Sequence, residues 1–202
     1  ENDPLQQKHA TDIDRISFGK AGQHNGIVLL ESKNHLKVQF KNTSIQSNLI
    51  GVYNFSNIAA AIAIGTYFGV ATAKIKRAIE TYIPQNNRSQ LITAGTNSVI
   101  LDAYNANPTS MLAALENFKQ AEGKNKVLFL GDMFELGPDT QEEHQNIVNF
   151  IEENKIGRTY LIGAYFAKAQ TNWSEIYRFQ SFEGLKEHLK NNPPTNSFIL
   201  IK

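Results

Sequence analysis

Polar side chains follow three of the apolar runs in this chain, at the point where each run ends. Asp102 follows SVIL and opens the segment DAYNANP, Asp132 and Glu135 follow VLFL, and Gly163 follows TYLI. In parallel α/β sheets, ligands bind beyond the carboxyl ends of the strands, where loops and helix amino termini converge. If these runs are parallel strands, the pattern predicts one ligand-binding edge that holds carboxylates and amides.

The segment DAYNANP also has the residues that begin a helix. Asn107 is a favoured N-cap, and Pro108 suits the first helical position because its missing N–H would have no partner there. Capping alone is therefore the favoured interpretation of Asn107 taken by itself. For Asp102, a ligand contact and a hydrogen bond within the loop are equally compatible with the sequence.

The segment GDMFELGPDTQEEH supplies carboxylates just past a strand. Asp132 and Glu135 have the charge to recognise an ammonium group, but the same side chains can order a loop. Thr140 and Glu143 have the spacing of a capping box, which is the favoured interpretation of Glu143. His144 has no second histidine four residues on, so its position does not indicate a metal site.

Two more polar features lie earlier in the chain. Asn54 and Asn57 are three residues apart, hence on one face of a starting helix, and a side-chain amide offers a donor and an acceptor to a purine edge. A helix cap would also explain Asn54. Arg88 lies in a neutral linker, where it could bind phosphate or ribose, or pair with a carboxylate.

Hydrophobic periodicity predicts the elements that position these residues. Residues 15–50 hold short β-prone runs, RISFG and the alternating HLKVQF among them, that predict a meander of hairpins. Residues 52–68 and 73–83 have the apolar spacing of two helices. The polar stretch PQNNRSQ, residues 84–90, is the predicted linker.

Beyond the linker the chain alternates strand and helix. The runs VLFL and FILI are apolar without alternation, as expected of strands that helices cover on both faces of a parallel sheet. We therefore predict a domain of β-strands and two helices in residues 1–86, and a doubly wound, Rossmann-like α/β domain in residues 87–202.

Composition excludes several functions. The chain has 202 residues, no cysteine and a net charge of +1, so thiol chemistry and cysteine-ligated metals are excluded, and no overall charge favours nucleic acid or an anionic membrane. The absence of cysteine fits a reducing cytoplasm. No apolar run reaches the roughly 18 residues of a membrane span, and the opening ENDPLQQKHA has no apolar core of a signal peptide. The patterns GxxxxGK[ST], GxSxG and HExxH are missing, so self-contained nucleotide hydrolysis is not indicated.

Three segments in order resemble the Mur ligase family: GVYNFSNIAAAIAIGTYFGV, LDAYNANPTSMLAAL, and FLGDMFELG followed by EEH. The resemblance covers nearly the whole chain. YNANP followed by SM is similar to the branch that adds D-alanyl-D-alanine, whereas relatives that add other amino acids tend to carry AHNP there. The resemblance implies the last part of a central ATPase domain followed by a Rossmann-like third domain.

The resemblance also implies an ATP-dependent amide ligase. In such enzymes ATP phosphorylates the terminal carboxylate of UDP-MurNAc-tripeptide, and the amine of D-alanyl-D-alanine attacks the acyl phosphate. The Mg²⁺ ligands are expected upstream with the phosphate-binding loop, so no metal ligand is expected here and the chain is expected to be inactive alone. Some relatives carry a fused alanine racemase-like domain.

Matching positions carry the nucleotide contacts of the family. Asn54 and Asn57 match the asparagine pair near adenine, Arg88 matches the arginine that reaches the nucleotide, and Asp102 matches the aspartate by the ribose. Asn87 departs from the pattern, because glycine often precedes the arginine.

The expected catalytic residues are Tyr104, Asn105 and Asn107, which match the loop that faces the phosphates and the incoming amine. Asp132 and Glu135 are the expected substrate-binding residues. Two other functions stay open. A sister ligase adding a different amino acid is one, and a non-catalytic nucleotide- or dipeptide-binding module is the other, which a longer protein without a phosphate-binding loop would favour.

Overall fold

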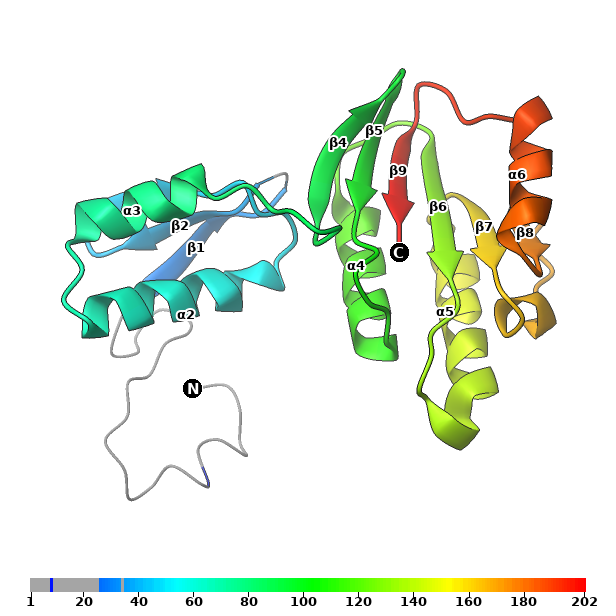
Figure 1. Ribbon diagram of the computed structural model, residues 1–202, viewed down its shortest axis with the longest axis horizontal. Helices are drawn as coiled ribbons and strands as arrows, with labels where there is room; N and C mark the ends of the chain where they lie inside the picture. The colour runs from blue at the N-terminus through cyan, green and yellow to red at the C-terminus, as the bar shows by residue number, and fades with distance from the viewer. Residues whose placement is uncertain (1–7, 9–25, 34) are drawn as a thin grey trace. The chain divides into compact units, whose positions relative to one another are not determined.

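The computed structural model describes residue 8, residues 26–33 and residues 35–202, and it contains two compact units (Figure 1). The units are Glu1–Pro84 and Gln85–Lys202, so the division falls within the polar stretch PQNNRSQ. The predicted run RISFG lies outside the described residues. Within the described residues, no helix is long and apolar enough to cross a membrane.

The first unit contains an antiparallel sheet. Its strands are β1 (Ile27–Glu31), β2 (Lys37–Phe40) and β3 (Thr43–Gln46), in the order β1-β2-β3. The alternation of HLKVQF is confirmed, because Leu36, Val38 and Phe40 are all buried in one core. Alternating residues of a strand point to opposite faces, so this face of the sheet is the apolar one.

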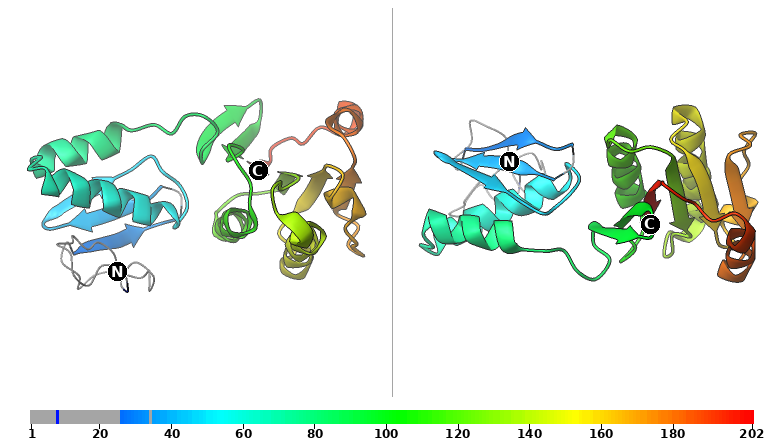
Figure 2. Two further views of the ribbon diagram at one scale, coloured as in Figure 1. Left: turned by 60° about the horizontal axis from the view of Figure 1, so that its bottom comes forward. Right: turned by 90° about the horizontal axis from the view of Figure 1, so that it is seen from above.

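Two helices cover that core. They are α2 (Asn54–Tyr67) and α3 (Thr72–Thr81), each within two residues of the predicted ranges at both ends. Ile58 and Ile62 of α2, one helical turn apart, and Ile75 of α3 pack with the apolar strand residues. Figure 2 shows both helices on the same side of the sheet.

The second unit is built on a six-stranded sheet with the order β4-β5-β9-β6-β7-β8. The strands are β4 (Gln90–Ala94), β5 (Asn97–Leu101), β6 (Lys126–Gly131), β7 (Arg158–Ile162), β8 (Ile176–Phe179) and β9 (Phe198–Ile201). The α-helices are α4 (Pro108–Gln120), α5 (Thr140–Asn154) and α6 (Phe182–Asn191), and the 3₁₀ turns are η1 (Gly137–Asp139) and η2 (Phe166–Lys168). All strand pairs are parallel except β4–β5, so the predicted α/β fold is confirmed.

Helices lie on both faces of this sheet (Figure 1). Leu128 of β6 packs in one core with α4 and α5, whereas the preceding Val127 packs in a second core with Leu185 of α6. Successive residues of one strand thus enter opposite cores, which explains why these runs are apolar without alternation.

Strand β4, the antiparallel edge strand, was not predicted from the sequence. Its partner residues Ala94 and Asn97 enclose a two-residue turn, in which Gly95 has φ +59°. Glycine adopts this left-handed conformation without strain, and it is typical of tight hairpins. The neighbouring residues Leu91 and Ile92 are both exposed, as expected on an edge strand, and the apolar residues of QLITA do not alternate with polar ones.

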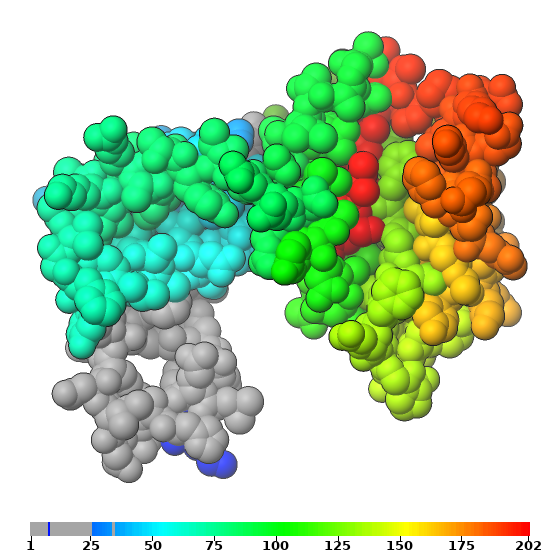
Figure 3. All heavy atoms as spheres, viewed as in Figure 1, coloured from blue at the N-terminus to red at the C-terminus, as the bar shows by residue number. Residues whose placement is uncertain are grey.

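The last strand of the chain lies inside the sheet. β9 pairs with β5 on one side and β6 on the other. Figure 3 shows the β9 segment as a red band between the green segment that holds β4 and β5 and the yellow-green segment that holds β6. The carboxyl ends of β5, β9 and β6 are therefore neighbours, which brings the residues that follow them to one edge.

Candidate functional site

Asp102 is the centre of a hydrogen-bond network at this edge. One carboxylate oxygen accepts the Ser89 N–H at 2.9 Å and the Ser89 hydroxyl at 3.1 Å, and the other accepts the Lys202 ammonium at 2.9 Å. The side chains of Lys202 and Asp102 are only 5% and 13% exposed. Buried ion pairs depend on complete hydrogen bonding, which Asp102 has here. The structure shows the hydrogen bonds of Asp102 within the protein, and a ligand contact by Asp102 stays a prediction.

The loop that follows Asp102 is held by the same lysine. Lys202 donates a second hydrogen bond, at 3.0 Å, to the backbone carbonyl of Asn105. Between these two contacts the chain bends outward, and the side chain of Tyr104 is 61% exposed. The side chain of Asn105 is also exposed, and its oxygen accepts the N–H of Ala106 at 2.9 Å. Lys202 thus holds the backbone of the loop at Asp102 and Asn105, while the side chains of Tyr104 and Asn105 are exposed to solvent.

Arg88 lies against Tyr104. The guanidinium carbon is 3.7 Å from the centre of the Tyr104 ring, which is a cation–π contact between two exposed side chains. The preceding Asn87 has φ +57°, in the left-handed region that glycine and asparagine adopt most readily. Asn87 stands where the family often has glycine, and its backbone has a conformation that glycine also adopts.

Asn107 caps helix α4. Its side-chain oxygen accepts the Ser110 N–H at 2.8 Å, and its own N–H donates to the Ser110 hydroxyl at 3.2 Å. Pro108 occupies the first helical turn, so the predicted helix start is confirmed. The cap therefore uses the side-chain oxygen of Asn107.

Replacing Asn107 by alanine is expected to lower the free energy of unfolding by about 1 kcal/mol, the usual effect of losing an N-cap. Asn107→Ser is the matched control, since serine caps equally well, and should lose less than about 0.5 kcal/mol. Urea unfolding followed by the fluorescence of Trp173, the one tryptophan of the chain, measures both. Equal loss in the two variants would contradict the capping role.

Asp132 and His144 form a second, buried network. Asp132 accepts the N–H groups of Tyr165 at 3.0 Å and Phe166 at 2.9 Å, so both of its oxygens are bound by the start of η2. His144 Nε2 accepts the Met133 N–H at 3.0 Å, and Nδ1 lies 2.6 Å from the Thr140 carbonyl, which requires a proton on Nδ1. His144 is thus a neutral side chain in this arrangement, and its 3.6 Å distance from Asp132 is not an ion pair.

The loop between Asp132 and helix α5 differs from its prediction in one respect. Asp139 is the N-cap residue of α5 and makes no side-chain cap, while the Thr140 hydroxyl donates to the Gly137 carbonyl. The predicted Thr140–Glu143 capping box is therefore wrong, because the turn η1 leads directly into the helix. Glu135 is exposed on this loop, with φ +64°.

In the first unit, Asn54 and Asn57 act as a pair. Asn54 is buried, and its amide donates to the Ile50 carbonyl at 2.8 Å. Its oxygen accepts the Asn57 amide at 2.9 Å, and Asn57 is exposed. Asn54 therefore orients Asn57, which is the member of the pair that can reach a ligand. Neither side chain caps α2.

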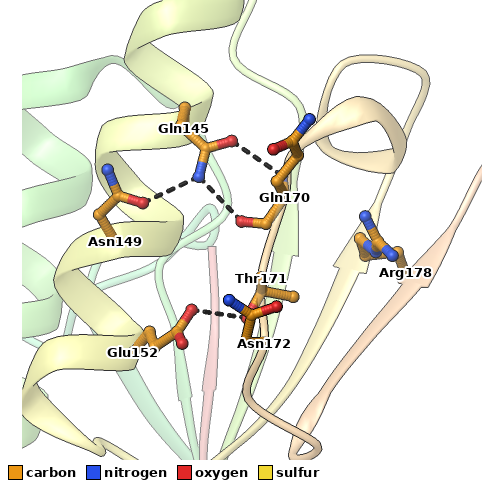
Figure 4. Close-up of a pocket in the computed structure, with 7 residues that line it drawn as sticks. All are labelled: Gln145, Asn149, Glu152, Gln170, Thr171, Asn172 and Arg178. Atoms are coloured by element: carbon orange, nitrogen blue, oxygen red, sulfur yellow. Dashed lines mark hydrogen bonds between the residues drawn. The ribbon is translucent and has the colours of Figure 1, made fainter.

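A pocket of about 500 Å³ lies elsewhere in the second unit, between α5 and residues 170–172 (Figure 4). It is open and polar, but its side chains bind one another. Gln145 bonds both the N–H and the carbonyl of Gln170, and Thr171 donates to Glu152 at 2.7 Å. These bonds tie the segment before β8 to α5, so the lining has a structural role.

Residues 87–198, more than half of the chain, match the family model described as "Mur ligase, glutamate ligase domain". The chain belongs to the Mur ligase family. The matched range includes Arg88, Asp102 and the loop to Asn107, so the predicted family is confirmed.

Relatives and solved structures agree with the family. Over its full length the chain aligns, at 31% identity, with 46% of the UDP-N-acetylmuramoyl-tripeptide--D-alanyl-D-alanine ligase of Bacillus subtilis. A crystal structure of MurF from Acinetobacter baumannii has a TM-score of 0.75 and 25% identity, covering 89% of this chain and 42% of that one. MurF from Thermotoga maritima in complex with ADP has a TM-score of 0.71 at 16% identity, over 87% and 42%, which shows the fold alone. The chain spans less than half the length of these relatives.

The partners of Asp102 were not predicted from the sequence. Lys202 had a signal, because it follows the apolar run FILI as Asp102 follows SVIL, at the end of a buried strand. Ser89 had none, since its contact depends on the left-handed conformation of the linker, where its φ is +48°. The contact between Arg88 and Tyr104 likewise depends on the path of this linker.

Proposed function

We propose that this chain is part of an ATP-dependent ligase that joins D-alanyl-D-alanine to UDP-MurNAc-tripeptide in peptidoglycan precursor synthesis. The observation that carries the proposal is the 31% identity, along the whole chain, to a Bacillus subtilis protein of that name. The segment YNANPTSM, which resembles this branch of the family, supports the choice among the Mur ligases.

In the proposed reaction, ATP transfers its terminal phosphoryl group to the carboxylate of the tripeptide. The amine of the dipeptide then attacks the acyl phosphate, an amide bond forms, and phosphate leaves. An acyl phosphate is hydrolysable, so a loop that orders the reactants and excludes water raises the yield of amide.

The nucleotide roles are divided among four residues. Asn57 contacts adenine in the proposal, because its exposed amide offers both donor and acceptor, and the buried Asn54 orients it. Arg88 contacts the ribose or phosphates through its exposed guanidinium. Asp102 lies by the ribose in the proposal, and it also holds the loop in place, since its oxygens accept hydrogen bonds from Ser89 and Lys202.

The loop supplies the proposed catalytic residues. Tyr104 and Asn105 are exposed at its bend, and Asn107 offers its amide nitrogen beside the helix start. Among the expected substrate-binding residues, Glu135 is the exposed carboxylate suited to the ammonium of the dipeptide, whereas Asp132 positions its loop from the buried side.

Magnesium is not assigned to these residues. Within the described part of the chain, no three His, Asp or Glu side chains form a group that could hold a metal ion. The sequence also has no GxxxxGK[ST] loop. We therefore propose that Mg²⁺ and the transferring phosphate are bound by other parts of a longer protein, and that the 202-residue chain alone is inactive.

The proposal is tested by phosphate release from the longer protein, with ATP, Mg²⁺ and UDP-MurNAc-tripeptide. Release that depends on D-alanyl-D-alanine is the expected result, and the 202-residue chain should release none. Release that requires another amino acid would identify a sister ligase, and no release at all would favour the binding module. Sequencing the coding region around the chain tests for the phosphate-binding loop and for a racemase-like domain.

Replacing Arg88 by alanine in the longer protein is expected to raise the KM for ATP by about tenfold, which corresponds to about 1.4 kcal/mol of binding. Arg88→Lys should recover only part of the loss, because lysine lacks the planar fork of donors. Arg77→Ala, at an exposed position of α3, is the matched control and should leave the KM unchanged. Steady-state kinetics measures all three, and equal effects at positions 77 and 88 would refute the assignment.

A further inference from the structure

Lys202 joins three segments that are far apart in the sequence. Its ammonium donates to the side chain of Asp102, after β5, and to the backbone carbonyl of Asn105, three residues further along the same loop. Asp102 in turn accepts two hydrogen bonds from Ser89, before β4. One cation therefore holds both ends of the bend that presents Tyr104.

The backbone fixes the position of Lys202 itself. Its N–H donates to the Phe129 carbonyl at 2.9 Å, and its carbonyl accepts the Gly131 N–H at 2.8 Å. On the other side, the Asp102 N–H donates to the Ile201 carbonyl at 2.9 Å. These bonds hold the backbone of Lys202 between β5 and β6. The Lys202 side chain is 5% exposed.

We infer that Lys202 is a positioning residue that holds the exposed bend at Tyr104 and Asn105 in its reactive geometry. The inference rests on the proposed function for its catalytic consequence. An ion pair with Asp102 alone would stabilise the fold without fixing the bend. The bond to the Asn105 carbonyl is the feature that acts on the loop, because it joins the far end of the bend to the sheet.

Two variants separate these effects. Lys202→Met removes both hydrogen bonds and leaves the Asp102 carboxylate without its cation. The double variant Asp102→Asn, Lys202→Met removes both charges, so it should regain most of the thermal stability that the single variant loses. It cannot restore the bond to Asn105, so the loop should stay mobile. Lys190→Met, an exposed lysine of α6, is the matched control.

The first measurement is ¹⁵N relaxation of the 202-residue chain. We expect the order parameters at Tyr104 and Asn105 to fall from about 0.85 to below about 0.6 in both variants that lack Lys202, and to stay unchanged in Lys190→Met. Loss of thermal stability with unchanged order parameters would overturn the inference. If Lys202→Met does not fold, the double variant decides, because it leaves no unpaired charge.

The second measurement is kinetic and uses the longer protein. We expect Lys202→Met to lower kcat by about ten- to a hundredfold, with the KM for ATP changed less than about threefold, because misplaced catalytic groups slow the reaction more than they weaken binding. An unchanged kcat with a mobile loop would overturn the inference. If the unsubstituted protein shows no release that depends on the dipeptide, the proposed function and the catalytic role both fail, while the relaxation result still decides whether Lys202 fixes the bend.

Discussion

Replacing Asp132 by alanine is expected to lower the free energy of unfolding of the second unit by about 3–5 kcal/mol, since two hydrogen bonds to a charged acceptor are lost and their donors are left without a partner. The donors are the N–H groups of Tyr165 and Phe166, at 3.0 and 2.9 Å, and the carboxylate is only 6% exposed. The midpoint of thermal unfolding should fall by roughly 10–20 °C.

Two variants test the cause of this loss. Asp132→Asn keeps one acceptor oxygen, so we expect about half of the effect. Glu135→Gln, on the same loop but exposed, should stay within about 0.5 kcal/mol of the unsubstituted chain. Thermal and urea unfolding followed by the fluorescence of Trp173 measures all three variants. A loss below 1 kcal/mol for Asp132→Ala is roughly the effect of an ordinary surface substitution. That result would contradict the structural role of Asp132 and favour direct substrate binding.

The sequence predicts the edge of the sheet at which these residues gather, because that edge follows from a local rule. Apolar runs mark strands, and the residues directly after them lie at the carboxyl ends. Asp102, Asp132 and Gly163 were found in this way, and all three follow parallel strands in the structure. The capping of α4 by Asn107 was predicted for the same reason, since it depends on residues only three apart.

Hydrogen-bond partners were not predicted where they depend on strand order. Lys202 contacts Asp102 across 100 positions, and only because β9 enters the sheet between β5 and β6. Asp132 reaches η2, 33 and 34 residues later, through the parallel pairing of β6 with β7. A carboxylate at a strand end looks the same in the sequence whether it binds a substrate or a neighbouring loop.

The close approach of Gly163 to Asp132 leads to the second large effect. A Cβ at position 163 would lie 2.2 Å from the Asp132 carboxylate, and the φ of +129° is one that other residues rarely adopt. The backbone cannot easily retreat, because the Gly163 N–H donates to Phe179 and its carbonyl accepts Ala167. Gly163→Ala is therefore expected to lower the free energy of unfolding by about 3–5 kcal/mol, from steric overlap and backbone strain together.

Gly137→Ala is the matched control for the backbone contribution. Its φ is +63°, but a Cβ there would meet nothing within 4 Å, so the loss should be only about 1–2 kcal/mol. The difference between the two glycine variants measures the overlap with Asp132 together with the additional backbone strain of φ +129° over φ +63°. Urea unfolding of the 202-residue chain gives both values, and equal losses would show that overlap contributes nothing.

The double variant Asp132→Ala, Gly163→Ala then tests whether both large effects arise from the same contact. Removing the carboxylate opens the space that the new methyl group needs, so the second substitution should add less to the first than it loses alone. We expect the two losses to fall short of additivity by about 1–3 kcal/mol, as for residues in direct contact. Additive losses would mean that the loop relaxes independently at the two positions, and that Gly163 is required for its backbone conformation rather than for the space it leaves to Asp132.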